Sequence, residues 1–284
     1  MIFNYWPHWF RKKVGGSWPD SYVCVDIESS GYSFDQDVIT EWGHCLVEDG
    51  KVVDQLSLVI DWTGRTSPPD HWLQNRLRQV RQGMELAGRT CHMSYDRMTA
   101  EGVKPDEAFK FIRDFTTKLQ QKRMPFVAHG GSFDEKMLSA NFLQFKYGNG
   151  YSFGDVYIDT EAIEKASQIP DNVRVHPKAS DTLREYFNRV KYTRITGLKS
   201  NMDEHCFTKY QFHEKHGIDK REMHAARMDS YCCHLLMQEF ATQVTDPIAA
   251  PVYPVADDKA ARKPEKATAA PLSGLKRIRG QRRS

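Results

Sequence analysis

The chain has 284 residues, of which 40% are hydrophobic and 12% aromatic, enough for one sizeable domain or two small ones with a real core. No apolar run of about 18 residues occurs, so we expect no transmembrane helix and no membrane partner. The N-terminal stretch lacks the order of a signal peptide. The six cysteines show no C-x-x-C spacing, which disfavours a zinc site and favours a reducing, cytoplasmic setting.

The formal net charge of +3 is unevenly distributed along the chain. Residues 247–284 contain nine Lys or Arg against three Asp or Glu, a charge of +6, which leaves about −3 for the remainder. We predict a disordered tail rich in Pro, Ala, Lys and Arg over residues 246–284. Its charge suits a tether to nucleic acid or to a polymerase or other replication partner, and a solubilising role is an equally compatible alternative.

The first half of the chain predicts a lead-in over residues 1–20 and then a three-stranded antiparallel meander. The strands are expected at Tyr22–Ile27, Val38–Val47 and Val52–Ile60, because each is rich in β-branched or aromatic residues. Two helices are expected next, one with Asp70 as its N-cap and one opened by Lys104-Pro105, since apolar residues then recur at helical spacing.

The second half alternates strands and helices. Short strands are expected at residues 125–129 and 156–160, helices beginning at Phe133 and Thr160, and further helical segments at Thr182–Val190, Ser200–His216 and His224–Val244. Antiparallel strands followed by strand–helix alternation predict an α/β domain over residues 21–245, with a mixed sheet and helices on its faces.

Two acids end the first predicted strand, Asp26 and Glu28. Side chains alternate between the faces of a strand, so both carboxylates point the same way. Like charges in this position favour a hard divalent cation between them, Mg²⁺ or Mn²⁺. The alternative is an inert, solvated pair. The turn that follows, Ser29-Ser30-Gly31, is small and polar and leaves its backbone N–H groups accessible to a substrate.

Further polar residues complete a candidate catalytic set. Asp134 follows a strand and a Gly-Gly turn, and Asp229 lies in the last predicted helix. His224 precedes Asp229 by five residues, which is about 140° around a helix, so the two face one site only if His224 lies on the loop before the helix. Carboxylates and a histidine in these places suit phosphodiester hydrolysis with two metal ions, in which the imidazole accepts a proton from the attacking water.

These residues form three motifs that resemble those of the DEDDh family of DnaQ-like 3′–5′ exonucleases. The motifs are Asp26-x-Glu28, the run Ala128-His129-Gly130-Gly131-Ser132-Phe133-Asp134, and His224-x₄-Asp229. Segments similar to the family's second strand (Ile39–Gly43) and fifth strand (Ile158–Thr160) extend the resemblance over residues 22–240. The resemblance implies a ribonuclease H-like fold with a mixed five-stranded sheet.

The resemblance also implies roles for single residues. Asp26, Glu28, Asp134 and Asp229 would be the ligands of two Mg²⁺ or Mn²⁺ ions, His224 the general base, and Ser29, Ser30 and Gly31 the lining of the pocket for the 3′-terminal nucleotide. Ala225 stands where the sister family has its catalytic tyrosine, which favours the histidine class. The chain departs from the family at Gly130, where Asn is usual, so an amide contact is expected to be missing.

The resulting expectation is a metal-dependent hydrolase that removes nucleotides from 3′ ends and releases nucleoside 5′-monophosphates. DNA and single-stranded ends are favoured, which fits a role in DNA replication or repair. Two alternatives stay open, a 3′–5′ exoribonuclease of the same family and a non-catalytic module that binds nucleic acid or a polymerase. The sequence leaves the oligomeric state open.

Overall fold

The computed structural model describes residues 18–154, 156–168 and 201–243. The predictions of most of the lead-in, of a helix over Thr182–Val190 and of a basic tail over residues 246–284 fall outside these ranges. Within them, no helix is both long and apolar enough to cross a bilayer.

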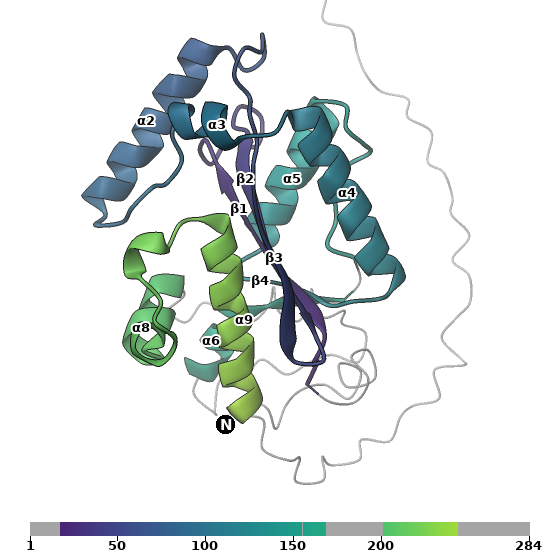
Figure 1. Cartoon of the computed structure of the whole chain (residues 1–284), viewed down its shortest axis with the longest axis vertical. Helices are drawn as coiled ribbons and strands as arrows, with labels where there is room; N and C mark the ends of the chain where they lie inside the picture. Colours follow the sequence, from purple (N-terminus) through teal and green to yellow (C-terminus); the bar gives the residue numbers. More distant parts are fainter. Residues whose placement is uncertain (1–17, 155, 169–200, 244–284) are drawn as a thin grey trace, which may run out of the picture. The chain divides into compact units, whose positions relative to one another are not determined.

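A five-stranded mixed sheet forms the centre of the fold, with the strand order β3-β2-β1-β4-β5 (Figure 1). The strands are β1 (Tyr22–Ser29), β2 (Ile39–Glu48), β3 (Lys51–Val59), β4 (Phe126–Ala128) and β5 (Tyr157–Asp159). The first three pair antiparallel, and β4 pairs parallel with both β1 and β5. The ribonuclease H-like α/β arrangement predicted from the sequence is thereby confirmed in strand number and direction.

Strand β1 contributes to both faces of the sheet because its side chains alternate. Val23, Val25 and Ile27 join the hydrophobic cluster that includes Phe109 of α4 and Met137 of α5. Tyr22 and Cys24 join the opposite cluster, which includes residues of α6 and α9. By the same alternation, Asp26 and Glu28 extend from the face that α9 covers.

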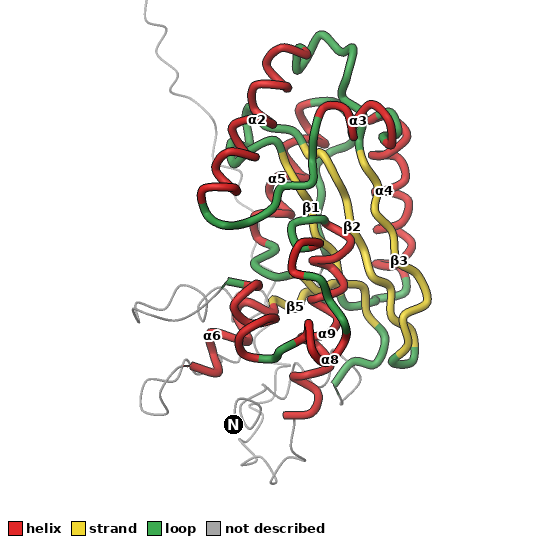
Figure 2. The backbone as a smooth tube through the Cα atoms, turned by 60° about the vertical axis from the view of Figure 1, so that its left-hand side comes forward, coloured by secondary structure: helices red, strands yellow, loops and turns green. Residues whose placement is uncertain are grey.

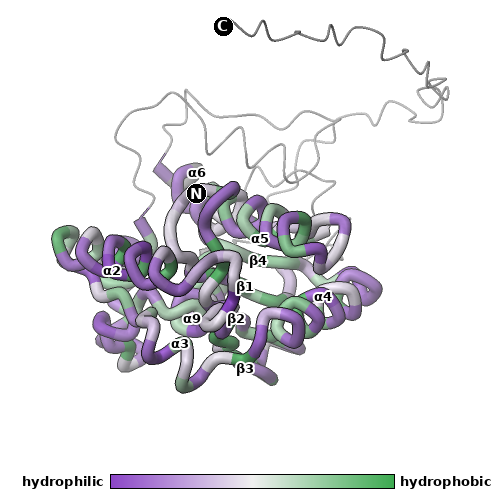
Figure 3. Tube along the Cα trace, turned by 90° about the horizontal axis from the view of Figure 1, so that it is seen from above, coloured by the Kyte–Doolittle hydropathy of each residue, from purple (hydrophilic) through white to green (hydrophobic). Residues whose placement is uncertain are grey.

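The helices lie on both faces of the sheet and beyond the end where β1 stops (Figures 1 and 2). They are α2 (Asp70–Leu86), α3 (Tyr95–Glu101), α4 (Pro105–Gln121), α5 (Ser132–Gln144), α6 (Thr160–Gln168), α8 (Phe212–His216) and α9 (Ala226–Gln243), with a π-helix η3 (Glu204–Lys209) and a 3₁₀ turn η4 (Lys220–Glu222). Figure 3 shows hydrophilic residues along much of α2 and hydrophobic ones in β4.

Three local predictions differ from the structure. The helix expected over Ser200–His216 is broken into η3 and α8, because Gln211 adopts a left-handed conformation with φ of 54°. Pro69, not Asp70, is the N-cap residue of α2, and the Asp70 carboxylate instead accepts a 2.9 Å hydrogen bond from the Gly64 N–H. Helix α3, which Ser94 caps through its side chain, was not predicted.

The segment between β3 and α4 contains α2, a connecting strap over residues 87–94, and α3. The strap contacts segments that are distant in sequence. His92 Nε2 lies 3.0 Å from the Met223 carbonyl oxygen, and Arg89 Nε lies 3.8 Å from a carboxylate oxygen of Asp203. The strap thereby links α2 to the two stretches of chain that precede η3 and α9.

Candidate active site

The two acids of β1, Asp26 and Glu28, lie two residues apart on the strand that pairs with β2. Asp26 is opposite Gly43 of β2, and Glu28 is opposite Glu41. Both β1 acids are half-buried, and they share the face of the sheet on which α9 lies. The prediction that the two carboxylates point the same way therefore agrees with the strand geometry.

Gly43 explains how α9 comes close enough to add a third acid. A Cβ atom built on Gly43 would lie under 3.0 Å from backbone atoms of Ala226 and Arg227, in the first turn of α9. Only glycine leaves room for this approach. Asp229 follows one turn later and is buried, so the contact at Gly43 fixes how far its carboxylate stands from the β1 acids.

Asp134 comes from the opposite side, in the first turn of α5. Its Oδ1 accepts a 3.1 Å hydrogen bond from the backbone N–H of Ile27, the residue between the two β1 acids. The preceding turn positions this helix. Gly130 has a φ of 72°, a conformation that glycine adopts without strain, and its N–H donates to Asp159 Oδ1 at 3.0 Å. Glycine therefore suits the backbone conformation of this turn.

The acids influence one another electrostatically. Burial, followed by the charges of Asp229, Asp134 and Glu28, raises the pKa of Asp26 well above its ordinary value. Burial and the charge of Asp229 likewise raise the pKa of Glu28. Burial raises the pKa of Asp229 to about 7, although the neighbouring His224 opposes the shift. Desolvated like charges produce this effect, and a bound cation would reverse it.

The donor set fits a divalent metal ion. Glu28, His224 and Asp229 each offer one ligand atom, and these atoms lie within 4.8 Å of one another. Carboxylate oxygens are the ligands that Mg²⁺ and Mn²⁺ prefer. Among the described residues, Asp26 and Asp134 do not belong to this group of donor atoms. Asp134 is instead linked to β1 through the Ile27 N–H, and the charges of Asp134 and Asp229 act on Asp26.

His224 lies outside α9, as its spacing from Asp229 requires. Its backbone is left-handed, with a φ of 65°, and its N–H donates to Asp229 Oδ1 at 3.2 Å. In the side chain, Nδ1 lies 4.0 Å from Asp229 Oδ2, and Nε2 lies 3.5 Å from Asp203 Oδ2. The imidazole is therefore placed between two carboxylates.

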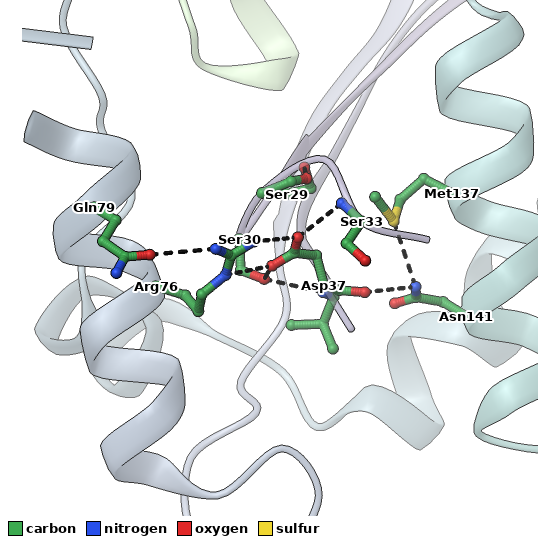
Figure 4. A network of polar contacts seen from close by, with 10 residues as sticks. Ser29, Ser30, Ser33, Asp37, Arg76, Gln79, Met137 and Asn141 are labelled. Atoms are coloured by element: carbon green, nitrogen blue, oxygen red, sulfur yellow. Dashed lines mark hydrogen bonds and ion pairs between the residues drawn. The ribbon is translucent and has the colours of Figure 1, made fainter. Parts of the chain in front are cut away.

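The turn after β1 is held by a buried ion pair (Figure 4). Asp37 is fully buried, and its carboxylate accepts from Arg76 of α2, from the Ser30 hydroxyl at 2.9 Å and from the Ser33 N–H at 2.8 Å. The Ser29 hydroxyl donates to the Gly31 carbonyl at 2.6 Å. Both serine hydroxyls therefore shape the turn, and the Ser30 side chain is buried within it.

Aromatic side chains stand exposed next to this turn. Tyr32 is 80% exposed and Phe34 36% exposed, and both rings contact Phe133, with centroid distances of 5.9 and 5.7 Å. Phe133 directly precedes Asp134. The sequence analysis did not single out this aromatic group, because only the fold brings the three rings together.

Comparisons with known proteins found similarity in solved structures alone. No protein-family model matches the chain, and no curated protein matches it. Three similar structures are of Escherichia coli exonuclease I. The complex with a dT13 oligonucleotide has a TM-score of 0.48 and an identity of 12% over 78% of this chain. The zinc-bound complex with single-stranded DNA has a TM-score of 0.48 and an identity of 11% over 79% of this chain. The product-bound form has a TM-score of 0.46 and an identity of 11% over 78% of this chain.

The chain spans about two fifths of the length of these structures, between 41% and 43%. With TM-scores below 0.5 and an identity of 11–12%, the likeness carries no argument about the fold or the activity of this chain. The function has to be argued from the residues of the site.

Three further charged groups, Glu41, Arg97 and Asp203, border the acids and were missed as site residues. Glu41 is buried, and its carboxylate accepts from Arg97 at 3.1 Å and from Ser57 at 2.5 Å. The charge of Glu41 raises the pKa of Glu28, while Arg97 lowers it. Asp203 contacts His224, as described above. No sequence motif marks Arg97 or Asp203, because each meets the site through packing of distant segments.

Proposed function

We propose that the chain is a metal-dependent 3′–5′ exonuclease that hydrolyses the terminal phosphodiester bond and releases nucleoside 5′-monophosphates. The observation that carries the proposal is the convergence of acids from β1, α5 and α9, next to an imidazole that lies outside the helix. A stable fold has no need for several desolvated carboxylates in one place, whereas two-metal phosphodiester hydrolysis needs them.

Each residue has a distinct role in this proposal. Asp26, Glu28, Asp134 and Asp229 would hold two Mg²⁺ or Mn²⁺ ions, which when bound supply Lewis acidity at the scissile phosphate. The neutral imidazole of His224 accepts a proton from the attacking water. The Ile27 N–H fixes Asp134, and the contact at Gly43 fixes Asp229, so the acids meet the substrate in one arrangement.

The substrate end would lie on the turn after β1. The turn Ser29-Ser30-Gly31 presents its backbone to the terminal nucleotide, held rigid by the pair of Asp37 and Arg76. Tyr32 and Phe34 offer exposed rings on which unpaired bases can stack. Stacking favours single-stranded ends, and DNA is the favoured substrate. An exoribonuclease is the alternative, because recognition of a 2′-OH depends on local contacts.

The test uses a 5′-labelled single strand, as DNA and as RNA, incubated with the full chain and Mg²⁺ or Mn²⁺. We expect a ladder that shortens from the 3′ end, absent in Asp26→Asn and unchanged in Asp35→Asn, an exposed acid of the neighbouring loop. A ladder on RNA alone would replace DNA by RNA in the proposal. Tight binding of ends without cleavage under either metal would overturn the proposal in favour of a binding module.

A further inference from the structure

A fifth acid, Glu41, lies beside the four acids of the candidate site. It stands directly opposite Glu28 in the β1–β2 pair, so the two side chains extend from the same face of the sheet, with Cβ atoms about 5 Å apart. Glu41 is only 1% exposed. Two carboxylates in opposite positions destabilise a sheet unless a cation compensates for one of them. The surroundings of Glu41 therefore decide whether it binds a metal ion together with Glu28 or stays apart from the metal site.

Both oxygens of the Glu41 carboxylate accept hydrogen bonds within the fold. Oε2 accepts from Arg97 at 3.1 Å, and Oε1 accepts from the second guanidinium nitrogen at 3.4 Å and from the Ser57 hydroxyl at 2.5 Å. A guanidinium that contacts both oxygens of a carboxylate fixes its orientation as well as its charge. Among the described residues, the group of donor atoms to which Glu28 belongs does not include Glu41. The contacts therefore hold Glu41 beside the candidate metal site but outside its donor group.

Helix α3 fixes Arg97 in turn. Ser94 caps this helix by accepting from the Arg97 backbone N–H at 3.0 Å, and Arg97 Nε donates to Glu101, one turn later, at 3.0 Å. Met98, the next residue in the chain, is fully buried in the core. The Arg97 side chain is 21% exposed, so solvent screens its contact with Glu41 only in part. The guanidinium thus reaches Glu41 from a capped and anchored helix.

The charge of Glu41 reaches the candidate metal ligands. Burial is the main cause of the raised pKa values of Asp26, Glu28 and Asp229, and the charge of Glu41 adds to each of them. Arg97 acts on Glu28 in the opposite direction. Four ionised carboxylates carry as much negative charge as two divalent cations carry positive charge. As an ion pair, Glu41 and Arg97 leave this balance unchanged, whereas an unpaired Glu41 would add a further negative charge.

We infer that Arg97 is a positioning residue that keeps Glu41 out of the set of metal ligands, so that the four proposed ligands alone hold the two metal ions. This inference rests on the proposed function, because it concerns the ions that those acids would hold. A pair that only stabilises the fold would leave the affinity for metal ions unchanged when one of its charges is removed. A Glu41 that itself binds a metal ion would weaken that affinity whenever it is replaced, with or without Arg97.

The test measures the affinity of the full chain for Mn²⁺ by isothermal titration calorimetry in the absence of nucleic acid. Glu41→Gln keeps the shape of the side chain but leaves Arg97 as an uncompensated cation near the metal ions, so the dissociation constant should rise about 10-fold. Arg97→Met leaves the opposite charge, so the constant should fall by a similar factor. The double variant Glu41→Gln/Arg97→Met removes both charges and should return to within about twofold of the wild type.

The matched control is Arg81→Met, which breaks an exposed ion pair with Glu85 on α2 and should bind Mn²⁺ like the wild type. A double variant that binds as weakly as Glu41→Gln would make Glu41 a metal ligand and overturn the inference. Equal affinity in all variants would also overturn it. If Arg97→Met fails to fold because it leaves a buried carboxylate unpaired, the comparison of Glu41→Gln with the double variant decides.

The outcome for the inference is separable from the outcome for the proposed function. A wild type that binds Mn²⁺ but cleaves no nucleic acid would contradict the proposed function, while the affinities of the variants would still decide the role of Arg97. A wild type that cleaves nucleic acid, with variants whose affinities do not shift, would overturn the inference alone. A wild type that binds no Mn²⁺ would overturn both.

Discussion

The substitution Gly43→Ala tests whether the approach of α9 to the sheet sets the geometry of the site. The added Cβ would lie under 3.0 Å from backbone atoms of Ala226 and Arg227, whereas atoms in contact lie about 3.5–4.0 Å apart. Backbone in a first helical turn cannot rotate away as a side chain can. The N-terminal turn of α9 must therefore move by about 1 Å, and Asp229 and His224 move with it.

Two magnitudes follow from this shift. Forcing an extra carbon atom into a packed interior costs about 1–3 kcal/mol of stability. A displacement of about 1 Å at a catalytic group costs about 100-fold in rate. We therefore expect Gly43→Ala to unfold at lower urea concentration and to lose most of its metal-dependent digestion of a labelled single strand.

The matched control is Gly83→Ala in α2, where no atom lies within 4 Å of the added carbon. Alanine is the better helix former by about 1 kcal/mol, so this variant should be slightly more stable and fully active. A Gly43→Ala protein with the stability and cleavage rate of the wild type would refute the reasoning. Loss of stability with an unchanged rate per folded molecule would refute the part that concerns Asp229.

Three other perturbations test separate parts of the structure. Burial raises the pKa of Asp229 from 3.8 to about 7, so between these pH values the folded metal-free protein binds more protons than the unfolded chain, and its stability should fall as the pH rises. Thermal unfolding in EDTA should show a smaller fall in stability for Asp229→Asn than for the wild type. An equal fall would contradict the assignment of this pKa to Asp229. Arg76→Met leaves the buried Asp37 carboxylate unpaired and should cost about 3 kcal/mol in urea unfolding, whereas Arg78→Met, at an exposed position of the same helix, should cost little. Replacing Tyr32 and Phe34 by Ala should raise KM for single strands about 10-fold or more, because stacking is lost, without lowering kcat. The control is Leu143→Ala, which removes another exposed apolar side chain, 57% exposed in the structure. An unchanged KM would show that the two rings do not contact the substrate.

The sequence predicted those features that depend on local periodicity. Alternation along β1 placed Asp26 and Glu28 on one face, and the rotation of an α-helix required His224 to lie before α9. Both arguments use geometry within a few residues, and the strands and most helices followed from the same kind of pattern. The roles assigned to these residues stay predictions.

Contacts between distant segments could not be predicted from one sequence. The residues around Gly43 do not indicate that Ala226 will pack against it. Likewise, the residues around Asp203 do not indicate that it will contact His224. Gln211 adopts the left-handed conformation that separates η3 from α8, but it is not a glycine, so its sequence does not predict the break. In each case tertiary packing, rather than local preference, decides the outcome.

The acids come from the two ends of the described chain, Asp26 from its first strand and Asp229 from its last helix. Contacts of such wide sequence separation form late, because they require closure of a long loop. During synthesis a growing chain would carry the β1 acids long before α9 emerges to join them. The complete acid cluster therefore forms only once the whole domain has folded. Partly synthesised or locally unfolded chains are expected to leave nucleic acid intact.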